Sequence, residues 1–264
     1  MALFNYQGNK IFLQDILAKL KAIKIKSGDN LMVHSGLKEI GKLASTKDVK
    51  KLGNLIIDSL LKAIYPGTLI SPTYTYSFCK NQDFNPTNNL SNMGSLVNIF
   101  WKRKDSLRSS HPIFSVAAIG KRAKYFTKIE KNVSLGKNSF FEKLVKENVK
   151  ILGFGIKLLP ALTLLHHIEK TNAVPYRYNK IFSGRIIVGN KKIFKKYNYF
   201  VRKLELEPEL RLEKIEKFLK QKNALFNISF GGSCLEVIES KKVFNLLSGK
   251  LKKDPYWMIK LCSI

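Results

Sequence analysis

The chain has 264 residues, of which 45% are hydrophobic and 11% aromatic, proportions that describe a folded globular protein and exclude a disordered one. Its 47 lysines and arginines outnumber its 19 aspartates and glutamates, and the resulting net charge of +28 favours anionic partners. The basic residues run from Lys10 to Lys260 without one tract or recognition motif, so we expect no nucleic-acid partner. No apolar run approaches the ~20 residues that span a bilayer, so we expect no membrane insertion.

The cysteines and the first residues indicate a cytoplasmic protein. Cys79, Cys234 and Cys262 are widely spaced and odd in number, so they fit neither a zinc pattern nor a disulfide framework. We expect them to be inert packing residues in a reducing compartment, and we expect no metal. The stretch MALFNYQGNK lacks a basic segment followed by an apolar core and does not resemble a signal peptide.

Buried strands alternate with helical apolar stripes over the first two thirds of the chain. We expect strands at Leu31–His34, Thr68–Pro72, Phe114–Gly120 and Val149–Gly155. We expect helices near Phe12–Leu20, over residues 50–65, from a capping Ser91 to Trp101, around Phe140–Glu147 and from about Pro160. The stretch up to Leu90, rich in Asn, Pro, Thr and aromatics, reads as a long loop, which inside a compact domain usually carries function.

The pattern changes from about Ser183, where the run IIVGNKKIF predicts a β-hairpin that turns at Gly189-Asn190. Two helices are expected after it, over Pro208–Phe218 with Glu207, Glu209 and Glu213 in or near the first turn, and over Lys241–Ser248 with Gly249 ending it. The alternation, without internal repeats or linkers, predicts a single α/β domain over residues 1–264. We expect a layered α/β/α core with a mixed, partly parallel sheet and an additional C-terminal hairpin and helices.

Two adjacent histidines in TLLHHIEK, residues 163–170, raise the question of a general base, because the chain has only four histidines. On a helix, His166 and Glu169 share a face, whereas His167 points about 100° away. A carboxylate bound to one imidazole nitrogen leaves the other free to accept a proton and raises its basicity. The spacing therefore favours His166 as the base, although histidines on apolar helices are commonly packing residues.

Two polar segments are candidates for binding an anion. In RSSHPIFS, residues 108–115, Arg108 offers a planar fork for phosphate or carboxylate, two serines add hydroxyls, and Pro112 constrains His111 to an extended conformation. In HSGL, residues 34–37, a strand ends in a hydroxyl and a glycine, where backbone N–H groups can face an anion. Both segments are also compatible with an ordinary loop or strand end.

A third candidate is the loop SPTYTYSF–NQDFNP, within residues 71–86, which is dense in Tyr, Thr and Asn and holds a single carboxylate, Asp83. Such side chains suit a sugar-like ligand with many hydroxyls, and equally a polar surface loop. The chain has no G-x-G-x-x-G, no P-loop, no G-x-S-x-G elbow and no H-E-x-x-H. It also lacks the R/Q-x-x-G-x-G/A coenzyme loop and the hexapeptide repeats of other acyltransferases.

The chain resembles the aminoglycoside 3-N-acetyltransferase family, also called the antibiotic N-acetyltransferase family, in an ordered set of stretches. These are LMVHSGL (31–37), PGTLISPTYT (66–75), FNP (84–86), MG (93–94), RSSHPIFSVAAIG (108–120), the Gly136–Ser139 region, ILGFGIKLLPALTLLHHIE (151–169) and VPYR (174–177). The likeness spans roughly residues 30–180 and is looser afterwards. It implies transfer of an acetyl group from acetyl-coenzyme A to an amine on a sugar.

The resemblance also implies roles for particular residues. The family's T-x-x-H-x-x-E pattern falls on Thr163, His166 and Glu169, which implies a catalytic group with His166 as the base. Coenzyme contacts are expected from His34, Ser35, Gly36, Leu37, Arg108, Ser109, Ser110, His111, Phe114 and Ser115, with Arg108 on the phosphates. Backbone N–H groups near Ser35–Leu37 or Ser110 are candidate oxyanion donors. Acceptor contacts are expected from Thr73, Tyr74, Tyr76, Asp83 and Asn85.

The sequence departs from the family in its acceptor segment. Between Ser71 and Pro112 it has only two carboxylates, Asp83 and Asp105, and Asn85 stands where the family often has Asp before a proline. A polycationic aminoglycoside needs carboxylates, whereas a charge of +28 attracts a phosphorylated substrate. We therefore expect the acceptor to be a nucleotide-linked (dTDP- or UDP-) amino sugar for a surface polysaccharide such as the O-antigen of lipopolysaccharide. The alternatives are an aminoglycoside 3-N-acetyltransferase conferring resistance and an inactive basic binding module; the oligomeric state is left open, a homodimer included.

Overall fold

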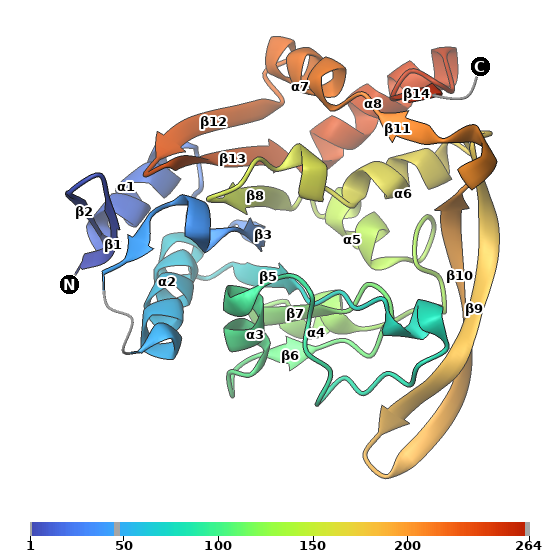
Figure 1. The fold of residues 1–264 in the computed structure, drawn as a ribbon, viewed down its shortest axis with the longest axis horizontal. Coiled ribbons are helices and arrows are strands. Elements are labelled where there is room, and N and C mark those ends of the chain that lie inside the picture. Colours follow the sequence, from blue (N-terminus) through green and yellow to red (C-terminus); the bar gives the residue numbers. More distant parts are fainter. Residues whose placement is uncertain (1, 45–47, 262–264) are drawn as a thin grey trace.

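A computed structural model describes residues 2–44 and 48–261, which are built around a seven-stranded sheet (Figure 1). The strand order is β12-β13-β8-β3-β5-β7-β6. The bounds are β3 (Asn30–Ser35), β5 (Thr68–Pro72), β6 (Leu107–Arg108), β7 (Val116–Gly120), β8 (Lys150–Phe154), β12 (Leu225–Phe230) and β13 (Ser233–Glu239). Within this sheet, β3 pairs in parallel with β5 and β8, and the other pairs are antiparallel. The predicted mixed, partly parallel sheet is confirmed.

Helices cover both faces of the sheet because alternate strand residues enter two separate hydrophobic cores. On β3, Leu31 and Val33 enter one core and Met32 enters the other. The core of Leu31 is closed by α1 (Leu13–Ala22), α2 (Val49–Ile64) and α3 (Ser95–Trp101). The core of Met32 is closed by α4 (Ala123–Thr127), α5 (Phe140–Lys146), α6 (Leu164–Thr171), α7 (Leu212–Gln221) and α8 (Ser240–Lys253). The α/β/α layering is therefore confirmed.

A long hairpin of β9 (Arg177–Val188) and β10 (Lys191–Arg202) flanks the second core and reaches beyond the main sheet (Figure 1). It turns at Gly189, which has a φ of 58°, as the sequence predicts. Each strand has twelve residues, and β9 begins at Arg177, before the predicted start near Ser183. Arg177 and Arg202 face each other at the base of the hairpin, and Phe84 of the long loop bridges to Ile186.

Several short elements lie outside the predicted pattern. The strands are β1 (Ala2–Tyr6), β2 (Asn9–Phe12), β4 (Lys42–Leu43), β11 (Pro208–Leu210) and β14 (Ile259–Leu261). The 3₁₀ helices are η1 (Leu37–Glu39), η2 (Ser77–Lys80), η3 (Leu159–Ala161) and η4 (Leu204–Leu206). Helix α4 and the antiparallel pair β12–β13, which forms one end of the sheet, are also not predicted from the sequence.

Three predicted helix ends are wrong. Ser91 does not cap α3, which starts after Gly94, because the Ser91 hydroxyl donates to the carbonyl of Tyr74 and accepts from an N–H in its own loop. Pro208 starts strand β11 instead of a helix, so that of the three glutamates only Glu213 lies in the first turn of α7. Gly249 does not end α8, which continues to Lys253.

The two cysteines within the described residues, Cys79 and Cys234, are free thiols. Cys79 packs against the core of Met32, as expected of a packing residue. Cys262 lies outside the described residues.

Candidate active site

Helix α6 is positioned by a tight crossing from the end of β8. Gly155 turns the chain with a φ of 72°, and a side chain there would lie 2.6 Å from the carbonyl oxygen of Gly36, so the turn requires glycine. On the neighbouring strand β13, the buried Glu236 carboxylate accepts the N–H of Leu158 at 2.8 Å. These contacts hold the segment that leads into Thr163, the N-cap residue of α6.

His166 and Glu169 meet on one face of α6 as the spacing predicts. Nδ1 of His166 lies 2.9 Å from Oε2 of Glu169. The Glu169 side chain has no exposed surface, whereas the His166 side chain keeps 22% of its surface exposed. Among the described residues, no partner is found for Nε2 of His166. One ring nitrogen is therefore held by the protein while the other is open to a ligand.

The Glu169 carboxylate has two further partners, from β9 and the residue before it. The Tyr176 hydroxyl donates to Oε1 at 3.0 Å. Nε of Arg177 lies 2.9 Å from Oε2, an ion-pair contact in which the N–H is not aligned for a hydrogen bond. Nη2 of Arg177 also lies 2.9 Å from Nδ1 of His166, and its Nη1 donates to the carbonyl of Phe200 at 3.2 Å.

These contacts determine the charge state of the pair. Burial lowers the pKa of His166, and the positive charges of Arg177 and Arg202 lower it further, against the opposing effect of Glu169. Burial opposes ionisation of Glu169, but the hydrogen bond from His166 and the charge of Arg177 keep its pKa below the usual range. At neutral pH the site therefore holds a neutral imidazole against an ionised carboxylate, which is the state required of a general base.

His167, the neighbouring histidine on α6, is a buried packing residue. Its Nδ1 accepts the N–H of Gly136 at 3.1 Å, and its ring lies between Phe141 and Phe244. Burial lowers its pKa to about 4, so the ring stays neutral. Its contacts are with core residues and with none of the groups around Glu169.

Aromatic side chains from three segments pack together beside this helix face. Phe114 is the centre of the cluster, with ring centroids 5.1 Å from Tyr74, 6.4 Å from Tyr76 and 5.2 Å from Tyr199. The Tyr74 hydroxyl is buried and lies near Thr163 without a hydrogen bond of good geometry to any described residue. The structure thus brings Tyr74 of the predicted acceptor loop next to Thr163 at the start of α6, with Tyr76 in the same aromatic cluster.

Arg108 does not present its fork to a ligand. Its guanidinium donates four hydrogen bonds within the chain, to the hydroxyl and carbonyl of Thr73 and to the carbonyls of Pro86 and Asn89. It also lies 4.5 Å from the ring of Trp101. Because four of its N–H groups are used, the predicted role on coenzyme phosphates does not fit, and Arg108 instead ties down the long loop between β5 and α3.

The rest of the RSSHPIFS segment is also saturated by the chain itself. Thr73 and Ser115 exchange hydrogen bonds, and the Ser109 hydroxyl accepts the N–H of Val116. His111 accepts the N–H groups of the two residues after Pro112 on Nδ1, and its Nε2 lies 3.3 Å from the carbonyl of Val133. Burial lowers its pKa to about 4. Of this segment, Ser110 is partly exposed and forms no hydrogen bond within the described residues.

In the HSGL segment at the end of β3, Gly36 is required by close packing. A side chain on Gly36 would lie 2.0 Å from Cγ2 of Ile156, and the N–H of Gly36 already donates to the carbonyl of Phe154. This N–H is therefore not an oxyanion donor. His34 is buried on β3, and burial lowers its pKa to about 4. No hydrogen bond within the described residues joins this segment to His166.

A mainly apolar pocket of about 540 Å³ opens directly after this strand. Leu37 and Lys42 line it on one side, and Leu52 of α2 and Ile99 of α3 on the other. Of the predicted coenzyme residues, Leu37 is the one that this pocket exposes.

Two predicted acceptor residues are used by the protein itself. The Asp83 carboxylate pairs with Nε of Arg185 on β9 at 2.9 Å. The Asn85 side chain accepts both the N–H and the hydroxyl of Thr87, as in a local turn. The Asp83 charge is therefore paired and the Asn85 amide oxygen is occupied, whereas Tyr76 remains 37% exposed.

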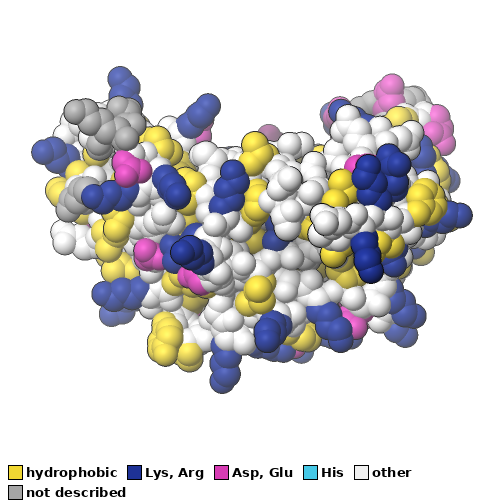
Figure 2. Space-filling model, turned by 90° about the horizontal axis from the view of Figure 1, so that it is seen from below, with side chains coloured by type: hydrophobic (Ala, Val, Ile, Leu, Met, Phe, Trp, Pro, Cys, Tyr) yellow, Lys and Arg dark blue, Asp and Glu magenta, His cyan; other side chains and the backbone are white. Residues whose placement is uncertain are grey.

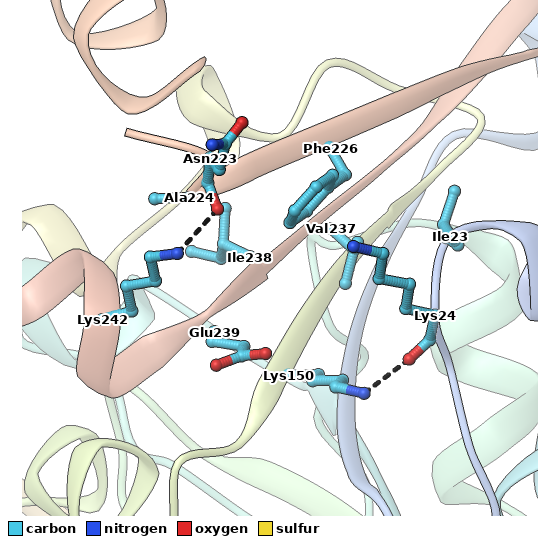
Figure 3. A pocket seen from close by; sticks show the side chains of 10 residues that line it. All are labelled: Ile23, Lys24, Lys150, Asn223, Ala224, Phe226, Val237, Ile238, Glu239 and Lys242. Atoms are coloured by element: carbon cyan, nitrogen blue, oxygen red, sulfur yellow. Dashed lines mark hydrogen bonds between the residues drawn. The ribbon is translucent and has the colours of Figure 1, made fainter. Parts of the chain in front are cut away.

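Positive charge is spread over one face of the molecule and is not confined to one element. Figure 2 shows Lys and Arg side chains scattered across one face, with few acidic ones between them. A separate pocket of about 200 Å³ is lined by Lys24, Lys150 and Lys242 (Figure 3), but two of these amines already donate to backbone carbonyls. Within the described residues there is no group of three or more His, Cys, Asp or Glu side chains that could hold a metal ion.

Sequence reasoning missed four residues around His166: Tyr176, Arg177, Tyr199 and Arg202. Two of them lie in VPYR, a stretch that the family resemblance singles out without a role for its arginine. The other two come from the end of β10, which reaches the site only because the hairpin pairs Arg202 with Arg177. Because Tyr199 and Arg202 are far from Glu169 in sequence, no local residue spacing indicates that they lie near it.

Comparison with known proteins identifies the family. The model of the aminoglycoside 3-N-acetyltransferase family matches residues 32–252. The chain belongs to this family. It is an N-acetyltransferase family that uses acetyl-coenzyme A, so the predicted resemblance is confirmed at this level.

Two relatives illustrate the match. The SPbeta prophage-derived aminoglycoside N(3')-acetyltransferase-like protein YokD of Bacillus subtilis (strain 168) is 25% identical over 236 residues, covering 80% of this chain and 81% of that protein. Aminoglycoside N(3)-acetyltransferase III of Serratia marcescens is 26% identical over 177 residues, covering 62% of this chain and 65% of that protein. Neither name refers to a nucleotide-linked sugar.

Solved structures share the fold. A structure of AAC-IIIb described as binary with CoASH superposes with a TM-score of 0.76 at 20% identity, covering 91% of this chain and 96% of that one. AAC-VIa bound to sisomicin gives a TM-score of 0.75 at 18% identity, covering 91% and 97%. Within the described residues, no helix has the length and apolarity needed to cross a membrane.

Proposed function

We propose that this acetyltransferase moves an acetyl group from acetyl-coenzyme A to an amine of an aminoglycoside, with His166 as the general base. The observation that carries the proposal is the His166–Glu169 pair, in which Nδ1 is held at 2.9 Å and Nε2 has no partner among the described residues. This geometry supports the aminoglycoside alternative and the nucleotide-sugar expectation equally. The family and its relatives' names favour the aminoglycoside alternative.

The chemistry requires one proton acceptor and one leaving group. The acceptor amine forms a bond to the acetyl carbonyl carbon while Nε2 of His166 takes the amine proton. The C–S bond then breaks, the acetylated amine is the product, and the coenzyme leaves as a thiol once the proton returns to sulfur. A positioned base contributes ~10²–10⁴-fold to such a step. Glu169 keeps the proton of Nδ1 in place, so that the lone pair of Nε2 faces outward.

The apolar pocket beside Leu37 is our proposed site for part of the coenzyme. It follows the end of a parallel strand, where ligands of open α/β sheets commonly bind. Its volume of about 540 Å³ is in the range of small-molecule sites. Lys38 and Lys42 at its wall supply positive charge for phosphates. This placement retains Leu37 from the predicted coenzyme residues and drops Arg108.

A nucleotide-linked amino sugar remains the second candidate because of the charges near the base. Arg202 is exposed and opposes Arg177 in the hairpin register, so both side chains project from the same face. Its positive charge acts on His166, Tyr176 and Tyr199. Among the described residues, the carboxylate beside His166 is that of Glu169, which is fully buried, and Asp83 is paired with Arg185. An acceptor that carries a phosphate group therefore fits the positive charges of Arg177 and Arg202 better than a polycation does.

An acceptor panel with free-thiol detection separates these possibilities. We expect thiol release with gentamicin- or kanamycin-type amines, and none after His166→Asn. Turnover of dTDP- or UDP-linked amino sugars with no turnover of aminoglycosides would replace the first proposal with the second. Absence of thiol release with every amine, together with salt-sensitive binding to nucleic acid, would indicate an inactive basic binding module.

A further inference from the structure

The imidazole of His166 has two competing neighbours at the same nitrogen. Nδ1 lies 2.9 Å from Oε2 of Glu169 and also 2.9 Å from Nη2 of Arg177. A carboxylate can only accept from Nδ1, whereas a guanidinium can only donate to it. The two bonds therefore belong to different tautomers of the neutral ring, and only one of these leaves Nε2 able to take a proton.

We propose that Arg177 is a positioning residue of the acetyl transfer: it holds Glu169 against Nδ1 of His166 and keeps the ring unprotonated. This proposal rests on the proposed role of His166 as the base. Arg177 does not contact the acceptor, because its side chain is only 3% exposed. It affects the acetyl transfer through its contacts with Glu169 and His166.

The anchoring of Arg177 supports a positioning role. Nη1 donates to the carbonyl of Phe200 on the partner strand β10, so the guanidinium is fixed by the hairpin independently of α6. Nε lies 2.9 Å from Oε2 of Glu169, and the Tyr176 hydroxyl binds Oε1. The carboxylate is thus held from β9 on one side and by Nδ1–H of His166 on the other. Because its charge is stabilised by these partners, Glu169 accepts a hydrogen bond from Nδ1–H, and the proton stays on the imidazole.

The charge of Arg177 supplies the second part of the role. The groups that face His166 are Glu169 on its own helix, Arg177 from β9 and Arg202 from β10, with the Tyr176 and Tyr199 hydroxyls nearby. One negative charge is therefore set against two positive ones. A cation beside an imidazole disfavours the imidazolium. Without Arg177, the buried pair of Glu169 and His166 would bind a proton more readily and the base would be lost at low and neutral pH.

Imidazole ¹⁵N NMR can test this directly, because the chain has only four histidines and His166→Asn assigns the signal. We expect His166 of the unmodified chain to carry its proton on Nδ1. Arg177→Met should raise the protonation midpoint of the pair by about one pH unit or more. Arg177→Lys keeps the positive charge, so the protonation midpoint should stay near the original. It loses the guanidinium contact that orients Oε2 of Glu169 toward Nδ1, so the Nδ1–H tautomer should become mixed with the Nε2–H tautomer. Arg202→Met is the matched control from the same register position: it removes a charge without touching Glu169, and should raise the midpoint by less than Arg177→Met.

Three results would overturn the proposal. They are a proton on Nε2 in the unmodified chain, an unchanged or lowered midpoint in folded Arg177→Met, or an Arg177→Lys spectrum identical to the original in both midpoint and tautomer. If Arg177→Met does not fold, Arg177→Lys decides. None of these readouts needs acetyl transfer, so a failed acceptor panel would overturn the proposed function while leaving this proposal to be decided by the spectra.

Discussion

Two regions of the molecule present histidines among polar neighbours, and they differ in what the chain leaves unused. In the segment at residues 108–115, His111 has both ring nitrogens in contact with the backbone, and Arg108 donates four hydrogen bonds to the long loop between β5 and α3. On α6, the contacts of His166 with other described side chains are at Nδ1 alone, and 22% of its side-chain surface is exposed. The two regions contain similar residue types, but only the α6 region leaves a histidine nitrogen free of partners among the described residues.

The difference has a simple physical meaning. A buried polar group that is satisfied within the chain stabilises the fold and has little left to offer a ligand. A group held at one end and open at the other combines fixed orientation with reactivity. By this criterion the segment at residues 108–115 is a structural brace for the long loop between β5 and α3, and α6 is the better candidate to carry the chemistry.

The strongest test of this contrast is His166→Asn. The asparagine amide can still donate to Glu169, but it has no nitrogen equivalent to Nε2. We expect the turnover number to fall by ~10²–10⁴-fold because the general base is lost. The change is measured by thiol release under saturating acetyl-coenzyme A and acceptor, with circular dichroism to show that the fold is retained. A loss of less than about tenfold would mean that another group takes the proton.

Glu169→Gln should give the next largest effect, with a characteristic pH dependence. The negative charge of Glu169 raises the pKa of His166, so its removal beside Arg177 lowers that pKa. The acid limb of kcat/KM therefore moves to lower pH, opposite in direction to Arg177→Met, while the plateau falls by about tenfold as orientation is lost. Breaking a buried ion pair also lowers stability by about 3–5 kcal/mol, measurable by denaturant unfolding. A limb that moves upward would contradict the assigned charges.

Arg108→Met tests the brace. The substitution leaves the carbonyls of Thr73, Pro86 and Asn89 without this donor, and we expect the free energy of unfolding to fall by about 2 kcal/mol or more. The KM of the acceptor should rise several-fold because the loop with Tyr74 and Tyr76 loosens. The KM of acetyl-coenzyme A should stay nearly constant. A rise confined to acetyl-coenzyme A would restore the phosphate-binding role that the sequence predicts for Arg108.

The sequence predicts the part of this site that is local and fails on the part that is assembled. His166 and Glu169 are one helical turn apart, so their contact follows from helix geometry alone. Strands β3 and β5 are likewise recognisable as short apolar runs. By contrast, Arg177 and Arg202 reach the site through hairpin register, and Arg108 is saturated by carbonyls about 19–35 residues away in sequence. Gly249 fails as a helix end because tertiary packing of α8 outweighs the local cost of a glycine.

His167→Asn should have the smallest effect on activity and completes the comparison on one helix. The asparagine oxygen can replace Nδ1 as acceptor for the N–H of Gly136, but the ring contacts with Phe141 and Phe244 are lost. We expect a loss of about 1–3 kcal/mol in stability, measured by thermal unfolding, since a buried ring is replaced by a smaller group. Turnover per folded molecule should remain close to the original, because no contact of His167 reaches Glu169 or Nε2 of His166. Equal losses of turnover at the two adjacent histidines would show that disturbance of α6, and not the open nitrogen, explains the effect at His166.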